Sequence, residues 1–328
     1  MEFRILGSVQ IYDDRADLRI VPSGVKQRAL LGALVVSSGK ELPAGRLVDE
    51  LWGDNPPAHA ANALQAHVTR LRRLLRDASG TDARDGRLST RPTGYVLRAD
   101  DTSTDAHRFH QLVAGAQELT AGDPGRSVQL LRSALSLWRG RAFEGSERGP
   151  ICSSEASILE EARMAALELL YDASLRAGQY ERVAGELEGL TASHPLRERF
   201  CELLMISLYR CGRRAEALGA YERVHRRLIR DLGVEPGPSL RRCREAILYH
   251  SHPDLVRDGA PEPVASAAGA RPHVGVGVRP EEEMGVRLLR DEVAALQRRV
   301  DQLFQEQQVL VDRITRLTGT EVPSLPVP

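Results

Sequence analysis

The stretch "AANALQAHVTRLRRLLRDA", residues 60–78, decides the fold of the N-terminal part of the chain. Leucine and valine recur in it every three or four residues, which is the spacing of an amphipathic helix that packs one stripe on a core. The stretch therefore predicts a helix with a basic outer face. The apolar stripe comprises Leu64, Val68, Leu71, Leu74 and Leu75, and outside it stand Gln65, Thr69, Arg70, Arg72, Arg73 and Arg76.

Short elements are predicted on both sides of this helix. The alternating apolar residues Phe3, Ile5, Val9 and Ile11 indicate a small antiparallel sheet. "VKQRALLGALVVSSG" and "AGRLVDELWG" each predict a helix that ends at a glycine, and "GRLSTRPTGYVLRAD" predicts a β-hairpin that turns at Pro92-Thr93-Gly94. Residues 1–100 thus read as sheet, three helices and hairpin.

The pattern changes to helix throughout residues 101–250. The turn "RAGQYERV" recurs in kind as "RCGRRAEA" 34 residues later, with Gly178 and Gly212 as matched helix breakers. Antiparallel helix pairs at that period are typical of a tetratricopeptide-type solenoid. A further helix start is indicated by Asp123 and Pro124.

The remaining chain divides into three segments. Residues 251–281, rich in Pro, Gly, Ala and Val, predict a flexible linker, and residues 319–328 form a tail. Residues 282–318 carry five heptads, which favour a coiled coil that joins two copies of the chain, in parallel or antiparallel orientation; the alternative is a helix packed on its own chain. The dimerisation positions are Val286, Leu289, Val293, Leu296, Val300, Leu303, Leu310, Ile314 and Leu317, with Gln307 as a polar register residue.

Bulk composition excludes several classes. The 328 residues suit two or more domains, and 45 Lys and Arg balance 45 Asp and Glu, so overall charge does not point to nucleic acid or membrane. Aromatic residues make up only 4%, which disfavours single-strand binding by stacked rings. No signal peptide or membrane-length apolar run is present, so a soluble cytoplasmic protein is expected. The four cysteines form no C-x-x-C pair.

No pattern for catalysis, cofactor or metal stands out. His59 and His67 are eight residues apart, which is two helical turns, so they are not expected to bind a metal together. His107 and His110 have no cysteine or carboxylate cluster beside them, so they are interpreted as helix-surface residues. "GALVVSSGKE" has the wrong glycine spacing for a phosphate loop. We expect neither an enzyme nor a bound cofactor.

Local charge gives a positive signal. Between residues 60 and 98, eight arginines stand against three aspartates, a net of plus five. Such a concentration favours binding to a DNA backbone through counterion release. An isolated arginine-rich helix is more often a solvated face, but three helices followed by a hairpin that carries Arg91 is the order of a helix-turn-helix with a wing.

These residues resemble a known family. "KQRALLGALV", "RLVDELWGDNPPAHAANALQAHVTRLRRLL", "TRPTGYVL", "LWRG" and "HPLRERFCELLMISLYRCGRRAEALGAYERVHRRLIRDLGVEPGPSLRR" are similar to the Streptomyces antibiotic regulatory protein family over residues 1–250. The resemblance implies a mainly α chain: an OmpR-type winged helix, α+β, over 1–100, then an all-α, tetratricopeptide-like bacterial transcriptional activation domain over 101–250. No receiver domain precedes the winged helix, so aspartate phosphorylation is not implied.

The resemblance also implies a function and its residues. Family members bind direct repeats in double-stranded promoter DNA of antibiotic or secondary-metabolite gene clusters and recruit RNA polymerase with its sigma factor. The resemblance implies that the helix from Asn62 to Arg73 enters the major groove and that Arg70 reads a base, and a guanidinium fork does match a guanine edge. Further DNA contacts are implied for Lys26, Asn62, Gln65, His67, Thr69, Arg72, Arg73, Ser89, Arg91 and Tyr95, and a polymerase-facing loop for Asp54, Asn55, Pro56 and Pro57.

Two rival readings use the same elements. The helical repeats could serve a protein-interaction adaptor that touches DNA incidentally, or the winged helix could block polymerase as a repressor. The bases read, the target promoter and any activating ligand are left open.

Overall fold

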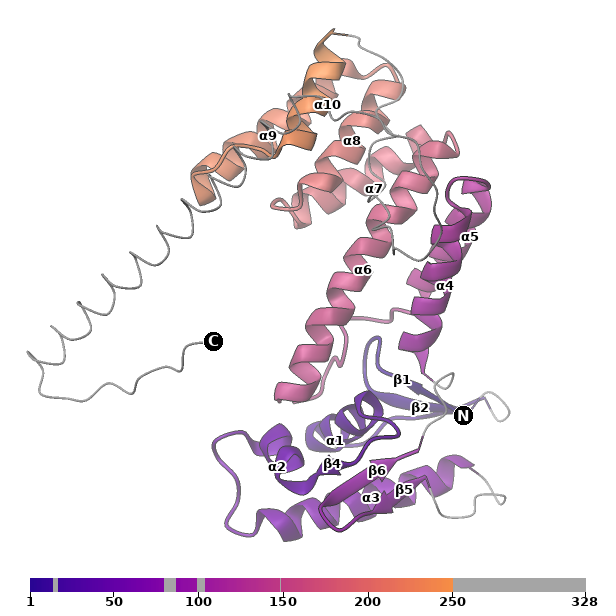
Figure 1. The fold of residues 1–328 in the computed structure, drawn as a ribbon, viewed down its shortest axis with the longest axis vertical. Helices are drawn as coiled ribbons and strands as arrows, with labels where there is room; N and C mark the ends of the chain where they lie inside the picture. Colours follow the sequence, from indigo (N-terminus) through magenta and orange to yellow (C-terminus); the bar gives the residue numbers. More distant parts are fainter. Residues whose placement is uncertain (14–16, 80–86, 99–103, 148, 250–328) are drawn as a thin grey trace, which may run out of the picture. The chain divides into compact units, whose positions relative to one another are not determined.

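The computed structural model describes residues 1–13, 17–79, 87–98, 104–147 and 149–249, and Figure 1 shows their helices and strands. The described residues all belong to one compact unit, Met1–Pro261. The predicted linker, heptad segment and tail lie outside the described residues. Within the described ranges, no helix has both the length and the apolar composition needed to span a membrane.

The quoted stretch forms one helix, α3 (Ala60–Ser79), as predicted. Leu64, Val68, Leu71 and Leu75 are at most 4% exposed, whereas Leu74 is only half-buried at the edge of the stripe. Burial of each such side chain contributes roughly 1.5 to 3 kcal/mol. They pack on α1 (Val25–Val36) and α2 (Ala44–Trp52), so the prediction of three helices around one core is confirmed.

Two small sheets flank these helices. The first has the order β1-β2-β3 and is antiparallel, with Phe3 opposite Ile11, which places both alternating apolar side chains in the core. The second has the order β4-β6-β5. The strands are β1 (Glu2–Arg4), β2 (Gln10–Asp13), β3 (Leu18–Ile20), β4 (Leu42–Pro43), β5 (Leu88–Thr90) and β6 (Gly94–Leu97).

Strand β4 was not predicted from the sequence. It has two residues and pairs Leu42 with Tyr95 and Pro43 with Gly94. A Cβ atom on Gly94 would lie 2.1 Å from the Leu42 carbonyl oxygen, so only glycine permits this close approach. The predicted hairpin therefore supplies two strands, β5 and β6, of a three-stranded sheet.

The second half is helical, as predicted. Successive helices α4 and α5, α5 and α6, α7 and α8, and α8 and α9 contact one another. Their bounds are α4 (Asp105–Leu119), α5 (Pro124–Ser136), α6 (Pro150–Arg176), α7 (Tyr180–Ser193), α8 (Glu198–Arg210), α9 (Arg214–Leu232) and α10 (Pro238–Tyr249).

The two matched turns have the same backbone geometry. Gly178 and Gly212 both have φ of 76°, a left-handed conformation that favours glycine. The residues after them, Gln179 and Arg213, donate backbone N–H bonds to the carbonyls five positions earlier, at 3.0 and 2.9 Å. The predicted repeat at this point is confirmed. Asp123 caps α5 by accepting from the Arg126 N–H at 2.9 Å, as the Asp-Pro pair indicated.

The prediction of helix throughout was wrong between α5 and α6. Residues 137–147 instead run beside the turn that joins β1 and β2, and they form hydrogen bonds with backbone groups of that turn. Arg139 and Phe143 donate their backbone N–H groups to the carbonyls of Leu6 and Ile5, at 2.9 and 3.0 Å. Phe143 is fully buried, and its ring packs so closely on α1 that a Cβ atom added to Gly32 would lie 3.0 Å from it.

A buried carboxylate joins the N-terminal sheet to the helical half of the protein. Asp105, at the start of α4, accepts from the backbone N–H groups of Ile5 (2.8 Å) and Leu6 (3.1 Å) and pairs with Arg139 (3.0 Å). Burial raises the pKa of the Asp105 carboxyl, and the hydrogen bonds and Arg139 oppose that rise. The buried apolar residues of the winged part and the helical part form one continuous cluster.

Candidate nucleic-acid interface

The outer face of α3 is a polar stripe. Asn62, Gln65, Thr69 and Arg73 are exposed and recur three or four residues apart, so they lie on one side of the helix. The Thr69 hydroxyl donates to the Gln65 carbonyl at 2.9 Å and keeps its oxygen lone pairs available. The stripe is opposite the buried leucines, because packing of the leucines fixes the rotation of α3.

Arg70 and Arg73 of this helix carry their charge without an ion-pair partner among the residues that the structure describes. Both are exposed. A guanidinium group has five N–H donors in a planar fork, which suits a guanine edge or a phosphate. Both side chains are therefore available for an external anion or base.

His67 is held on the inner flank of α3. The Gln27 side-chain amide donates both to the His67 Nδ1, at 2.8 Å, and to the His67 carbonyl oxygen, at 3.1 Å. Because the carbonyl requires a donor, the amide nitrogen must face His67, and Nδ1 is the acceptor. Burial, followed by the charges of Arg70 and Lys26, lowers the pKa of His67. Its Nε2–H group is then a neutral donor.

Arg72 points to the hairpin rather than into the stripe. Its Nε atom donates to the Leu88 carbonyl at 3.0 Å and a terminal nitrogen donates to the Thr90 hydroxyl at 2.6 Å. These bonds tie α3 to β5. The structure therefore places Arg72 where it orients the hairpin, while its predicted contact with DNA stays a prediction.

Lys26, at the start of α1, is engaged inside the protein. Its ammonium donates to the Leu51 carbonyl at 2.6 Å and to a Glu147 carboxylate oxygen at 2.8 Å. A phosphate contact by Lys26 would compete with Glu147 for the same group. The ion pair also links α1 and α2 to the residues just before α6.

The hairpin presents one arginine at its tip. Arg91 is exposed at the turn between β5 and β6, where its backbone N–H donates to the Gly94 carbonyl at 2.9 Å. Glu41 holds the same turn by accepting from the backbone N–H of Thr93 at 3.2 Å and from the Thr93 hydroxyl. Glu41 thus holds the backbone of the tip in place, and the Arg91 side chain is exposed to solvent.

The other predicted hairpin residues lie on the strands. Tyr95 in β6 is half-buried between Leu42 and Thr90. Ser89 in β5 lies opposite Val96 and donates weakly to the Val96 carbonyl at 3.5 Å. The structure brings α3 and the hairpin together through Arg72. Sequence reasoning missed the supporting roles of Gln27 and Glu41, for which no local pattern gives a signal.

The predicted polymerase-facing loop is exposed. It follows Gly53, which has φ of 55°, and the Asn55 backbone N–H donates to the Trp52 carbonyl at 3.1 Å. The loop consists of Asp54, Asn55, Pro56 and Pro57, and each is exposed.

Among the described residues, no group of three or more His, Cys, Asp and Glu side chains is arranged to hold a metal ion.

Two protein families match the two halves of the described chain. Residues 20–97 match "Transcriptional regulatory protein, C terminal", and residues 104–248 match "Bacterial transcriptional activator domain". The first match contains α3 and the hairpin, and the second covers α4 to α10 almost completely.

Full-length relatives contain both parts. The transcriptional regulator RedD of Streptomyces coelicolor is 41% identical over 249 residues, which are 76% of this chain and 70% of RedD. The regulatory protein DnrI of Streptomyces peucetius is 34% identical over 272 residues, 81% of this chain and 98% of DnrI. The structure also resembles that of Mycobacterium tuberculosis EmbR in complex with low affinity phosphopeptide, with a TM-score of 0.71 and 35% identity over 78% of this chain and 66% of EmbR.

Proposed function

Because the chain belongs to the Streptomyces antibiotic regulatory protein family of DNA-binding transcriptional activators, we propose that it binds direct repeats upstream of promoters and recruits RNA polymerase. The proposed targets are promoters of an antibiotic or secondary-metabolite gene cluster in the cytoplasm of the producing cell. The chain is a transcriptional regulator, not an enzyme.

One observation carries the DNA-binding part of this proposal. The exposed face of α3 bears Arg70 and Arg73 without ion-pair partners among the described residues, and Arg72 ties this helix to the hairpin that presents Arg91. A helix of this kind enters the major groove, and a hairpin beside it reaches the neighbouring backbone or minor groove. The arrangement therefore presents arginine side chains to the major groove and to the neighbouring backbone or minor groove at the same time.

The arginines of α3 divide between two tasks in this proposal. Arg70 reads a base, since a bidentate arginine contact with guanine O6 and N7 discriminates by roughly 1 to 3 kcal/mol. Arg73 binds phosphate and contributes affinity without sequence preference. Asn62, Gln65 and Thr69 complete the face with polar groups that can bond to bases or phosphates.

The hairpin and the loop from Asp54 to Pro57 make the contacts that α3 does not make. Arg91 enters the minor groove, while Tyr95 and Ser89 contact phosphate. The exposed loop from Asp54 to Pro57 contacts polymerase or its sigma factor, and its two prolines limit the conformational freedom that such a contact would otherwise remove.

Self-association is a separate proposal that rests on the sequence alone. The heptads between Val286 and Leu317 join two copies of the chain and raise the local concentration of one winged helix near a second repeat. The heptads lie outside the described residues, so their proposed role is independent of the geometry of α3.

The proposal is tested in two steps with the full chain. Selection from random DNA duplexes should enrich direct repeats, and a nuclease footprint should cover them. Transcription with purified polymerase and sigma factor from a promoter that carries the repeats should then rise. A footprint with reduced transcription would instead identify a repressor, and the absence of any footprint would favour a protein-interaction adaptor.

A further inference from the structure

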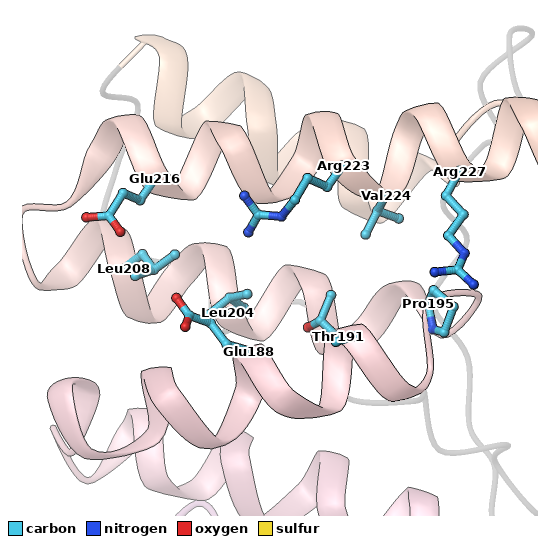
Figure 2. Close-up of a pocket in the computed structure, with 10 residues that line it drawn as sticks. Glu188, Thr191, Pro195, Leu204, Leu208, Glu216, Arg223, Val224 and Arg227 are labelled. Carbon is cyan, nitrogen blue, oxygen red and sulfur yellow. The ribbon is translucent and has the colours of Figure 1, made fainter.

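A cavity lies in the helical part, on the three consecutive helices α7, α8 and α9. Its volume is about 490 Å³, and Figure 2 shows the side chains around it. The floor is apolar, with Leu204 and Leu208 of α8 and Val224 of α9, each at most 4% exposed.

One wall of the cavity is cationic. Arg223 and Arg227 project from α9 in Figure 2, and Arg227 reaches the turn at Pro195. Both also line a second hollow, together with Arg226 and Arg230, so the two hollows adjoin along α9. The four arginines occupy positions i, i+3, i+4 and i+7, which is one face of a helix.

The described residues neutralise this wall only in part. Asp231 is the only carboxylate paired with these arginines among the described residues, with Arg227 at 3.2 Å and Arg230 at 2.8 Å. Arg223 forms no ion pair with a described residue. At the opposite end of the cavity, the Glu216 carboxylate already accepts from two guanidinium nitrogens of Arg213, Nε at 2.8 Å and Nη2 at 2.6 Å. Glu188 also lines the cavity, so the four arginines of α9 outnumber the carboxylates of Asp231 and Glu188 by two among the described residues, and this side of the cavity favours an anionic occupant.

Apolar side chains beside the arginines define the occupant further. Leu196, next to the cavity-lining Pro195, is 54% exposed, and it adds to the apolar floor formed by Leu204 and Leu208. A DNA backbone would leave these side chains against hydrated phosphates, which gains nothing from their burial. A protein segment with both carboxylates and leucine-like side chains would bury them and pair with the arginines.

We propose that this groove, defined by Leu204, Leu208, Val224, Arg223 and Arg227, binds an acidic segment of a partner protein. Carboxylates of the segment pair with Arg223 and Arg227, and one of its apolar side chains enters the cavity above Leu204 and Leu208. Arginine–carboxylate pairs bind in a bidentate manner and are stronger than neutral hydrogen bonds. The site is distinct from α3 and the hairpin, and it does not depend on the proposed promoter activity.

The test uses the full chain and two fluorescein-labelled peptides. One peptide alternates aspartate with leucine, and the other has asparagine in place of every aspartate. Fluorescence anisotropy should show binding of the aspartate peptide, weakened by added salt, and at least about tenfold weaker binding of the asparagine peptide. Equal affinity for both peptides, or no binding of the aspartate peptide, would overturn the proposal.

Variants locate the contact. Arg223→Glu with Arg227→Glu should weaken the aspartate peptide by about tenfold or more. The matched control is Arg182→Glu with Arg242→Glu, which changes charge equally at exposed positions of α7 and α10 outside the cavity, and it should change affinity less than about threefold. Arg223→Gln with Arg227→Gln repeats the test without charge reversal if circular dichroism shows that the glutamate pair is unfolded. Equal weakening by the control, or loss of duplex DNA binding with unchanged peptide binding, would refute a peptide groove here.

Discussion

The carboxylate of Glu50 accepts a hydrogen bond from the backbone N–H of Cys152, at 3.1 Å, although the two residues are 102 positions apart. The same carboxylate accepts from the N–H groups of Gly149 (3.1 Å) and Ile151 (2.6 Å). These are orphan donors of the first turn of α6, and a negative charge there also suits the helix dipole. Glu50 of α2 thus caps a helix of the other half of the protein.

The first prediction concerns this cap. Glu50→Ala removes a carboxylate that is 1% exposed and leaves three backbone donors without it, so the free energy of unfolding should fall by roughly 2 to 3 kcal/mol. Urea unfolding measures the change. The control is Asp49→Ala, because Asp49 is the exposed neighbour on the same helix, and its effect should be within about 0.5 kcal/mol. Equal losses in the two variants would show that the cap contributes nothing.

The second prediction separates reading from anchoring on α3. Arg70→Ala should reduce the preference for direct repeats over scrambled DNA, with a loss of roughly 1 to 3 kcal/mol on the preferred site only. Arg73→Ala should weaken both DNAs alike and reduce the slope of log affinity against log salt by about one. Titrations of both duplexes at several salt concentrations give both quantities. Unchanged selectivity in Arg70→Ala would remove the assignment of Arg70 as base reader.

The third prediction tests Arg72 as a positioning residue. If Arg72 acts by holding the hairpin, Arg72→Ala and Arg91→Ala should be non-additive in DNA affinity, because the first already misplaces the arginine that the second removes. The coupling in a double-mutant cycle should be about 0.5 to 2 kcal/mol. Arg72→Lys should not restore affinity, since an ammonium cannot reach the Leu88 carbonyl and the Thr90 hydroxyl with a planar fork. Additive losses would indicate that Arg72 contacts DNA directly.

Local pattern was enough to predict the elements that carry the site. The three-and-four spacing of leucines fixed the buried side of α3, and paired glycines fixed the turns at Gly178 and Gly212, because both signals come from neighbouring residues. Contacts between distant residues had no such signal. The partners of Glu50 and Asp105 are about a hundred positions away, and nothing beside either carboxylate marks it as buried.

The site itself shows the same limit. Arg72 and Arg73 are adjacent and identical in type, so composition cannot separate them. Their roles differ because α3 directs Arg72 toward β5 and Arg73 toward solvent, and the position of β5 depends on pairing with β6. Strand β4 was missed because two residues, one of them Pro43, are too few to show an alternating pattern.

The fourth prediction concerns the heptads. Leu296→Glu with Leu303→Glu would place two charges at d positions of the predicted seam, where their burial is unfavourable, and should lower the mass measured by light scattering toward that of one chain. The matched control is Gln297→Glu with Gln302→Glu, which adds the same charges outside the a and d positions. An unchanged mass in the leucine variant would refute the coiled coil.

The fifth prediction follows from His67. Its pKa is lowered from 6.5, so the unfolded state binds more protons than the folded state between the lowered value and 6.5. The stability that this group contributes is fully present above pH 6.5 and is lost as the pH falls through the folded pKa. As the pH falls across that window, the free energy of unfolding measured in urea should therefore decrease more for the native chain than for His67→Gln. The imidazole should titrate below pH 6.5 in NMR spectra.

The neutral state of His67 has a consequence for DNA binding. With Nδ1 accepting from Gln27, only the Nε2–H group is left to contact DNA, and above pH 6.5 that contact carries no charge. His67→Gln should therefore leave the salt slope unchanged at pH 7.5, even if it lowers affinity. A slope reduced by about one would mean that DNA binding protonates the ring, which would make His67 a cationic phosphate ligand despite its lowered pKa in the free protein.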